Sequence, residues 1–331
     1  MGSLRTTWYG LTDPGGRSGY ADLYVRSPQR TVFSGLAFAD AACAAYGLDG
    51  RIALVHNASA AVAGIVVFEK RWGPYRAASL PLYAEYSTPL LDGPLVAADV
   101  HRYQSPLDML LDALGSEYDQ VTLRLHPTLF DVRSFIWRGW DVAPAFQYEA
   151  TLETDDPVTG WQRYPRKAFR KYRDSYALRR GASYLDAVLS LEAASLERKG
   201  LKSLGEDALA TLAQRVLDAG LGEVLVVENN AGLVEAGVVA TFDPPLDGTT
   251  ATYWMVGSQR GPAMTVLIGH LARYAKERGC RQLCFGGANV PSVAEFKRGF
   301  GATLTPYFRV RLVTPTTLRV RDTLGRVFGQ R

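Results

Sequence analysis

Apolar and polar positions along residues 1–155 follow helical and strand periods in turn, which predicts an α+β domain. Residues 80–91 interrupt this pattern. They are bounded by prolines and rich in aromatic side chains, which favours an extended segment that lines a substrate. The periodic stretches predict, in chain order, a helix over 36–46, strands over 51–56 and 62–68, a helix over 107–114 capped by Ser105, a strand over 120–125, a helix around Phe135 and a strand over 146–152.

The periodicity breaks at residues 155–160 and then resumes. We therefore predict two tandem α+β domains, 1–155 and 156–331, each a mixed, mostly antiparallel sheet flanked by helices. A doubly wound nucleotide fold is excluded, because no Gly-x-Gly-x-x-Gly follows a first strand. The second half is predicted to contain a basic helix over 164–180, helices over 182–196 and 206–219, strands over 223–229, 233–242 and 250–256, a helix over 262–278 and a strand over 281–285.

A short segment near the C-terminus has a degraded copy about half the chain earlier. Residues 298–300 read Arg-Gly-Phe at the end of a predicted helix, and residues 138–140 read Arg-Gly-Trp in the same setting. A proline followed by an aromatic strand comes after each of them. An internal repeat of this kind predicts that the two domains are copies of one fold.

Composition excludes several classes of protein. With 331 residues and 47% hydrophobic content, the chain can build two cores of ordinary size. We expect a cytoplasmic protein, because no apolar run reaches the length of a membrane span and no signal peptide opens the chain. Three cysteines without zinc spacing favour neither a disulfide framework nor a metal site, so no metal is expected. The net charge of +4 is modest, but basic residues crowd residues 163–180.

The order of elements, taken with four segments, resembles the Gcn5-related N-acetyltransferase (GNAT) fold in doubled form. This doubled form is similar to the FemAB-like family of peptidoglycan aminoacyltransferases and related acyltransferases. The segments are residues 32–33, 81–89 and 166–180, and the run Glu-Phe-Lys-Arg-Gly-Phe-Gly at 295–301. The resemblance implies that an amine attacks an activated acyl group. The helical arm of some family members is absent here.

Lys297 is the first candidate for catalysis. Ser292 and Glu295 predict a capping box, and Phe296 and Phe300 share one helix face, so Lys297 lies beside the buried face. A fixed cation there could stabilise an oxyanion or hold a phosphate, and the alternative is a lysine exposed at a helix end. The FemAB-like resemblance implies that this lysine contacts the reacting centre.

Arg166, Arg170 and Arg173 recur at helical spacing within the predicted basic helix. Guanidinium groups bind phosphate through paired donors, so this face suits the pyrophosphate of a lipid or nucleotide carrier, or an RNA backbone. A solvated helix face is the alternative.

The loop that opens the helix over 262–278 is where the GNAT resemblance implies a coenzyme A pyrophosphate site. Arg260, Gly261 and Ala263 are the candidate contacts to the donor phosphate. Ser258 replaces the leading Gln or Arg of the family pattern, and Pro262 removes one amide donor, so we expect a damaged or altered coenzyme site.

Glu85 is a candidate to orient or deprotonate the acceptor amine, although no local partner identifies it as a base. Tyr83 and Tyr86 are candidate substrate contacts in the same segment. Core packing is the alternative for all aromatic candidates. The further candidate substrate contacts are Tyr253, Trp254, Phe285, Asn289 and Phe296.

The leading hypothesis is a FemAB-like N-acyltransferase that moves an aminoacyl group from aminoacyl-tRNA to an amine of a peptidoglycan precursor or similar acceptor. Aminoacyl-tRNA would then be a co-substrate, with no tightly bound cofactor. The acceptor could be phosphorylated, and a lipid-linked acceptor would bring peripheral membrane contact. One alternative is an acyl-CoA-dependent N-acyltransferase acting on a small molecule or saccharide. The other is a non-catalytic module that binds a phosphorylated glycan or lipid.

Overall fold

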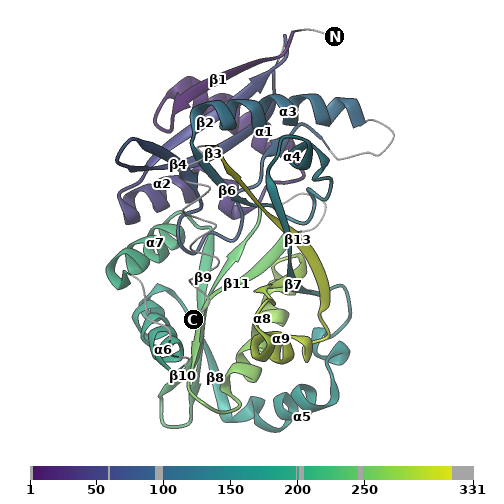
Figure 1. The fold of residues 1–331 in the computed structure, drawn as a ribbon. Coiled ribbons are helices and arrows are strands. Elements are labelled where there is room, and N and C mark those ends of the chain that lie inside the picture. Colours follow the sequence, from purple (N-terminus) through teal and green to yellow (C-terminus); the bar gives the residue numbers. More distant parts are fainter. Residues whose placement is uncertain are drawn as a thin grey trace. The chain divides into compact units, whose positions relative to one another are not determined.

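The structure is a computed structural model that describes residues 3–58, 60–93, 100–198, 200, 205–244 and 249–314 (Figure 1). The chain divides into two compact units. The first unit consists of Met1–Pro144 with Tyr307–Arg331, and the second consists of Ala145–Pro306. This division differs from the predicted boundary after residue 155, because residues 145–155 lie in the second unit and Tyr307 onward lies in the first.

The first unit contains a sheet in the order β1-β2-β3-β4-β6-β13, with β5 beside β3. All neighbours with a described register are antiparallel except β4 and β6, which run parallel. Its elements are β1 (Arg5–Gly10), α1 (Pro14–Arg26), α2 (Leu36–Tyr46), β2 (Asp49–His56), β3 (Ala61–Trp72), β4 (Tyr75–Ser79), β5 (Leu90–Leu91), α3 (Val100–Glu117), β6 (Gln120–Arg124), α4 (Arg133–Trp137) and the later part of β13 (Thr303–Val313).

Local sequence signals explain where the first helices begin and end. The Asp13 carboxylate accepts a hydrogen bond from the Gly16 amide at 2.9 Å, and Pro14 occupies the first helical position of α1. Helix α2 ends at Gly47, whose φ of 61° lies in the left-handed region that glycine adopts without strain. The predicted helix over 36–46 is confirmed, whereas β1 and α1 were not predicted.

The core of the first unit explains why β13 belongs to it. Leu110 and Leu114 of α3 pack with Ile65 of β3, and the same cluster contains Val310 and Leu312 of β13. Residues 309–313 pair with β6. Burial of apolar area is the main stabilising contribution in a core of this kind, so the last described strand completes the sheet of the unit in which the chain begins.

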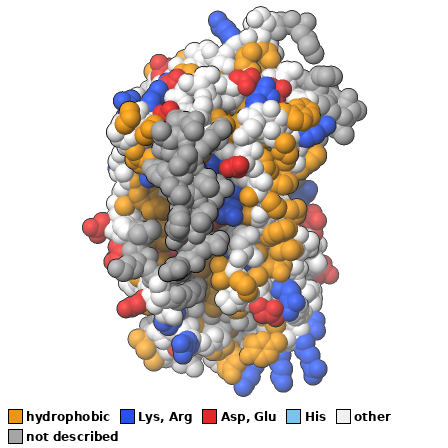
Figure 2. Space-filling view, in the orientation of Figure 1, with side chains coloured by type: hydrophobic (Ala, Val, Ile, Leu, Met, Phe, Trp, Pro, Cys, Tyr) orange, Lys and Arg blue, Asp and Glu red, His pale blue; other side chains and the backbone are white. Residues whose placement is uncertain are grey.

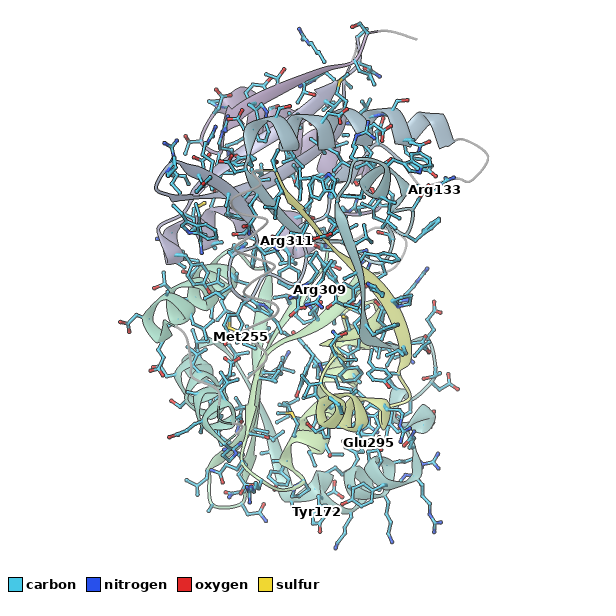
Figure 3. The ribbon with its side chains drawn as sticks, viewed as in Figure 1. Arg133, Tyr172, Met255, Glu295, Arg309 and Arg311 are labelled. Carbon is cyan, nitrogen blue, oxygen red and sulfur yellow. The ribbon has the colours of Figure 1, made fainter. Side chains whose placement is uncertain are left out.

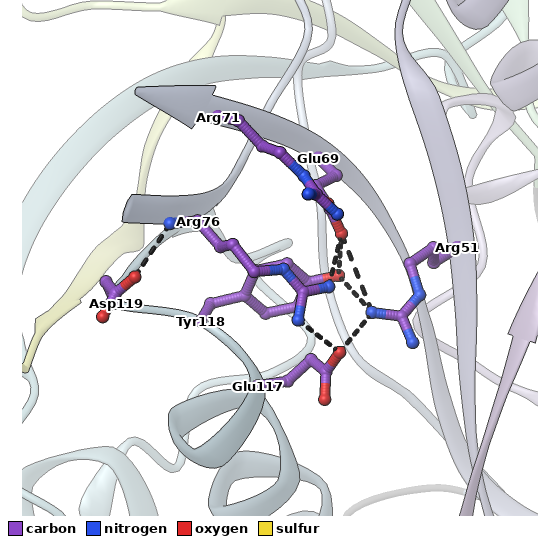
Figure 4. Close-up of polar contacts among 7 residues, drawn as sticks. All are labelled: Arg51, Glu69, Arg71, Arg76, Glu117, Tyr118 and Asp119. Carbon is purple, nitrogen blue, oxygen red and sulfur yellow. Dashed lines mark hydrogen bonds and ion pairs between the residues drawn. The ribbon is translucent and has the colours of Figure 1, made fainter. Parts of the chain in front are cut away.

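A buried polar cluster ties β2, β3 and β4 to the end of α3 (Figure 4). Glu69 is 8% exposed and forms ion pairs with Arg76 at 2.8 Å and Arg71 at 3.0 Å. Glu117 forms ion pairs with Arg51 at 2.6 Å and with Arg76 at 2.7 Å. Burial opposes ionisation of Glu69, but the hydrogen bonds from Arg76 and Arg71 outweigh it and lower the pKa of this carboxyl. Loss of Arg76 would leave the buried Glu69 with only the exposed Arg71 and the more distant Arg51 as partners, so the cluster is a strong local constraint.

The second unit contains a sheet in the order β7-β12-β11-β10-β9-β8, in which only β11 and β12 run parallel. The chain enters it along β7 (Asp141–Thr151). Its other elements are α5 (Arg163–Tyr172), β8 (Tyr176–Arg180), α6 (Leu185–Glu197), α7 (Glu206–Asp218), β9 (Gly222–Asn229), β10 (Val234–Phe242), β11 (Thr249–Ser258), α8 (Ala263–Glu277), β12 (Cys280–Gly287) and α9 (Pro291–Arg298).

Helices cover both faces of this second sheet. Helix α8 is apolar over most of its length and shares a core with Phe169 of α5, Phe285 of β12 and Phe300. On the other face α6 approaches β11 so closely that a Cβ at Gly257 would lie 2.1 Å from the Glu192 amide nitrogen. Gly257 is therefore required for this contact.

Two predicted helices have different limits in the structure. The basic stretch is not one helix over 164–180, because α5 ends at Tyr172 and Arg179 lies on β8, paired with Glu228 at 2.9 Å. The helix predicted over 107–114 begins before Pro106, although proline has no amide hydrogen to donate within the helix. Tyr103 packs in the same first-unit core as Leu110 and Leu114, which holds the earlier turn in place. The predicted irregular stretch is confirmed up to Leu90, where β5 begins.

Candidate functional site

The parallel strands β11 and β12 of the second unit pair along only part of their length. Their ladder ends where Thr252 lies opposite Cys284, although β11 continues to Ser258 and β12 to Gly287. A register shift between β10 and β11 at the same level leaves Trp254 out of the pairing. We call the parts of β11 and β12 that lie beyond Thr252 and Cys284 the strand fork; they are residues 253–258 and 285–287. Separated strand edges present backbone hydrogen-bonding groups, so the fork is suited to an extended ligand.

Lys297 lies at the β12 side of the strand fork. Its side chain is buried, with the residue 9% exposed, and its Nζ donates a hydrogen bond to the Gly287 carbonyl oxygen at 2.8 Å. Gly287 is the last residue of β12. A lysine fixed in this way is a point charge at a defined place, which is the requirement for stabilising charge that develops during a reaction.

The helix that carries Lys297 does not begin with the predicted capping box. Helix α9 follows Val290, whose side chain forms no cap, and Pro291 occupies its first turn. Ser292 therefore lies inside the helix, and Glu295 pairs instead with Arg298 at 2.7 Å (Figure 3). Proline supplies the helix start here because its fixed φ suits the first helical position.

Strand β7 places a carboxylate beside the same end of β12. Glu149 lies opposite Cys284, and Gln147 lies opposite Gly287. Gln147 Nε2 donates to one Glu149 oxygen at 2.6 Å, and Thr305 Oγ1 donates to the other at 2.9 Å. The sequence analysis missed Glu149, although the polar residues at 147 and 149 of the predicted strand were an available signal.

The aromatic candidates pack largely within the core. Tyr253 is 8% exposed, its hydroxyl donates to Met264 Sδ at 2.9 Å, and its ring lies 5.9 Å from that of Phe285. Burial raises the pKa of Tyr253, so the hydroxyl stays protonated. Phe285 stacks on Phe300 at 5.7 Å, whereas Phe296 contacts Phe300 but is 41% exposed. Core packing thus accounts for Tyr253 and Phe285, and of these three candidates Phe296 alone presents a broad surface.

Asn289 extends the contact between β12 and β7. Its Oδ1 accepts from the Phe146 amide at 2.9 Å and its Nδ2 donates to the Phe146 carbonyl at 3.1 Å. These two bonds imitate a strand ladder, so Asn289 positions the chain beyond the strand fork. Trp254 is also buried, at 6% exposure.

The predicted donor-phosphate residues lie before and at the start of α8. Gly261 has a φ of 141°, Pro262 precedes the helix, and Ala263 is its first, buried residue. Arg260 is exposed. The start of a 15-residue helix such as α8 leaves amides that favour an anion, but Pro262 contributes none.

Helix α5 has one apolar face and one strongly basic face. Pro165 and Phe169 are buried, and Phe169 packs under α8. The remaining positions of the helix carry five cations and no acidic residue: Arg163, Arg166, Lys167, Arg170 and Lys171. In the space-filling view, basic side chains gather at the end of the unit where α5 lies (Figure 2).

The three predicted arginines of this region have different surroundings. Arg166 donates to the Thr159 carbonyl at 3.0 Å, and Arg173 lies beyond the helix, 3.5 Å from Asp174. Arg170 is exposed. The five α5 cations form no ion pair with a carboxylate within the described residues.

The structure brings the basic helix next to the motif that carries Lys297. The Gln162 amide, just before α5, donates to the Gly299 carbonyl at 2.9 Å. A Cβ at Gly301 would lie 2.6 Å from the Gly160 carbonyl oxygen, and Gly301 has a φ of 69°. The close approach and the positive φ explain the glycine at 301, because a larger residue would separate the two segments, whereas Gly299 contributes a backbone carbonyl that any residue provides.

The first unit has a cavity of about 570 Å³ that holds two of the predicted residues. Tyr83, whose φ is 63°, and Glu85 line it. Glu85 is half-buried and accepts a hydrogen bond from Arg124 Nη1 at 3.1 Å. Tyr86 does not line this cavity: it is 5% exposed and packs edge-on against His126 at 4.8 Å.

The cavity of the first unit has an excess of positive charge. Arg124 on β6 lies directly opposite Arg309 on β13 (labelled in Figure 3), and both line the cavity. Like charges in directly opposed positions are unfavourable in a sheet. The pair with Glu85 neutralises only one of the two arginines.

The three cysteines are free thiols, and burial raises the pKa of Cys43 to about 11. Across the described part of the chain, no cluster of three or more His, Cys, Asp or Glu side chains could hold a metal ion. The helices described there also do not combine the length and hydropathy of a membrane span.

Comparison with known proteins identifies the second unit. Residues 162–298 match a family described as an acetyltransferase (GNAT) domain. No curated protein sequence matches the chain significantly.

Solved structures match the fold over nearly the whole chain. FemX has 10% sequence identity and a TM-score of 0.71, covering 97% of this chain and 99% of its own. A tandem GNAT protein from the clavulanic acid biosynthesis pathway has 12% identity and a TM-score of 0.57, covering 95% and 99%. L-PGS from Bacillus licheniformis has 12% identity and a TM-score of 0.55, covering 96% and 98%.

The protein is therefore an acyltransferase of the GNAT fold, with its GNAT acetyltransferase domain at residues 162–298. The fold of the whole chain resembles the tandem GNAT proteins, and FemX in particular, so its architecture is FemAB-like. The predicted fold class is confirmed.

Proposed function

We propose that the protein is a FemAB-like N-acyltransferase that moves an aminoacyl group from aminoacyl-tRNA to an amine of a peptidoglycan precursor or similar acceptor. The observation that carries this proposal is α5. A ten-residue helix with five cations and no acidic residue is bonded through Gln162 to the segment that follows Lys297. An RNA backbone supplies the phosphates that such a face requires.

The contrast between α5 and β8 supports a role for the helix in binding. Arg179 and Arg180 on β8 pair with Glu228 and Glu223 at 2.9 and 3.7 Å. These arginines are neutralised within the protein. The α5 cations are not, so they remain available for an external anion.

The strand fork supplies the place for the reaction. The acceptor nitrogen would attack the ester carbonyl carbon of the donor, and negative charge would develop on the carbonyl oxygen. The buried Lys297 ammonium, fixed at the end of β12, would stabilise that oxygen. The unit-1 cavity, with Glu85 and two arginines, is by itself suited to a ligand that carries a phosphate or carboxylate.

The test is transfer of a radiolabelled amino acid from aminoacyl-tRNA to a lysine-containing peptidoglycan precursor in solution. We expect label in the precursor with wild-type protein and none without it. Binding of uncharged tRNA should weaken steeply with salt, since phosphate contacts release counterions. Label that stays in tRNA, together with tRNA binding that is indifferent to salt, would contradict the proposal.

A second candidate is an acyl-CoA-dependent N-acyltransferase acting on a small molecule or saccharide. The fork and the α8 start, with Gly261 and Ala263, favour it. Thermal stabilisation by coenzyme A but not by tRNA would select this candidate. Stabilisation by a phosphorylated glycan or lipid, with no transfer from either donor, would select a non-catalytic binding module.

A further inference from the structure

We infer that Glu149 is the acceptor-binding base of the acyl transfer: its carboxylate holds the acceptor amine and takes the proton that the amine loses as it attacks. The inference rests on the proposed function for the reaction, but its binding half can be measured without turnover. The inference assigns the base to the second unit, whereas the candidate base predicted from the sequence was Glu85 in the first unit.

The position of Glu149 carries the argument. Glu149 lies opposite Cys284, the residue at which β12 separates from β11. Directly opposed residues of antiparallel strands direct their side chains to the same face. Two residues earlier on β7, Gln147 lies opposite Gly287, whose carbonyl holds Lys297. The carboxylate and the ammonium therefore flank the same four residues of β12.

The face that Glu149 occupies is the one away from α8. Its neighbours Tyr148 and Ala150 belong to the core that α8 covers, and side chains alternate along a strand. The Glu149 side chain is half-buried and lies on the face of the sheet opposite α8. The core that α8 covers therefore does not enclose Glu149, and on this face α6 covers the β11 arm of the fork at Gly257 rather than β7.

The hydrogen bonds of Glu149 fix its carboxylate without neutralising it. Gln147 and Thr305 each donate one bond, and both are neutral donors. Glu85 differs, because Arg124 already supplies a cation to it at 3.1 Å. A carboxylate held by neutral donors keeps its charge for an ammonium ligand, and each oxygen retains acceptor capacity.

The acceptor reacts as a free amine that has lost its first proton to water. The nitrogen attacks the ester carbonyl carbon, and a carbon–nitrogen bond forms. The nitrogen proton becomes acidic and moves to Glu149. The carbon–oxygen ester bond then breaks, and Glu149 returns the proton to the leaving oxygen, so that amine and ester become amide and alcohol.

The kinetic test uses two Glu149 variants of the full-length protein and one control variant. Glu149→Gln should lower kcat about 10²–10⁴-fold, the usual contribution of a general base, with the donor KM unchanged. The acid limb of the kcat pH profile should disappear. Formate should restore part of the rate of Glu149→Ala in a saturable way, which a merely structural glutamate would not show. Glu153→Gln, the same substitution at an exposed glutamate just beyond β7, is the matched control and should retain the wild-type kcat.

The binding test needs no turnover. In protein labelled with ¹³C at glutamate carboxyls, the Glu149 signal is identified by its loss in Glu149→Gln. Methylamine should shift this signal saturably, whereas tetramethylammonium at equal ionic strength, which cannot donate a hydrogen bond, should not.

The outcomes separate this inference from the proposed function. Wild-type protein that transfers no acyl group contradicts the proposed function, and the methylamine shift then decides the role of Glu149 alone. A Glu149→Gln variant with a wild-type kcat, or a Glu149 signal that responds equally to both cations, overturns the inference. A folded Glu149→Gln variant, shown by an unchanged melting temperature, is required for either result.

Discussion

Replacement of Lys297 by methionine is the sharpest test of the catalytic site. Methionine keeps an unbranched stem of similar length and removes only the ammonium. The structure places this ammonium in a buried position, 2.8 Å from the Gly287 carbonyl oxygen. If it stabilises charge that exists only in the transition state, kcat should fall about 10²–10³-fold, which corresponds to about 2.7–4 kcal/mol.

Two opposing contributions set the effect of Lys297→Met on stability. Loss of a hydrogen bond from a charged donor costs about 1.5–3 kcal/mol. Removal of a buried charge relieves a desolvation cost of similar or larger size. We therefore expect the free energy of unfolding to stay within about 1 kcal/mol of wild type. A lysine kept for structure alone would leave the rate intact and lower stability instead.

The assay combines steady-state kinetics with urea unfolding of the same preparations. Lys276→Met is the matched control, because Lys276 is half-buried on α8 and also donates to a backbone carbonyl, that of Asp155, at 3.0 Å. We expect wild-type kinetics for this control. Lys297→Met with a wild-type kcat would refute the reasoning, and a raised KM with kcat retained would assign Lys297 to binding a ground-state phosphate.

The remaining predictions concern charge in both units. The double variant Lys167→Gln with Arg170→Gln should weaken tRNA binding and reduce the slope of log affinity against log salt by about 1.4–1.8. Arg179→Gln should leave this slope unchanged, because Arg179 on β8 is already paired with Glu228. Equal slopes for the two variants would contradict the role of α5. Glu85→Gln should free Arg124 in the unit-1 cavity and strengthen binding of inorganic phosphate in a calorimetric titration, and weaker binding would contradict the excess of positive charge in this cavity. The lowered pKa of Glu69 stabilises the fold at neutral pH, and this contribution is lost as pH falls below 4.5 and through the folded pKa. Glu69→Gln should therefore flatten the acid branch of stability measured by urea unfolding from neutral to acid pH, and an unchanged branch would contradict this.

Sequence periodicity predicted the elements that carry strong local signals. The alanine-rich helix of residues 36–46 and the strand that ends at Arg124 were predicted nearly to their ends, because apolar period and turn residues agree there. The basic stretch was mispredicted beyond Tyr172, because Arg179 is held in a strand by Glu228, which is 49 residues away in sequence. No local rule contains a partner at that distance.

The candidate site shows the same division. Lys297 was predicted beside a buried helix face formed by Phe296 and Phe300, near the sheet. The structure places it at the end of β12 and buries Phe300, but Lys297 is itself buried and Phe296 is 41% exposed. The carboxylate of Glu149 could not be placed beside it, because β7 precedes β12 by more than a hundred residues and only strand pairing brings them together. Likewise, the opposition of Arg124 and Arg309 depends on the return of β13 to the first unit.

That return has a consequence for how the chain is made. The second unit is one continuous stretch, Ala145–Pro306, whereas the first needs Tyr307 and the residues after it. During synthesis the first unit therefore waits, with the edge of β6 uncovered, until the entire second unit has emerged from the ribosome. The part of the protein that is translated first is completed last, and a ribosome that stalls within the second unit would expose a nascent sheet edge to other chains.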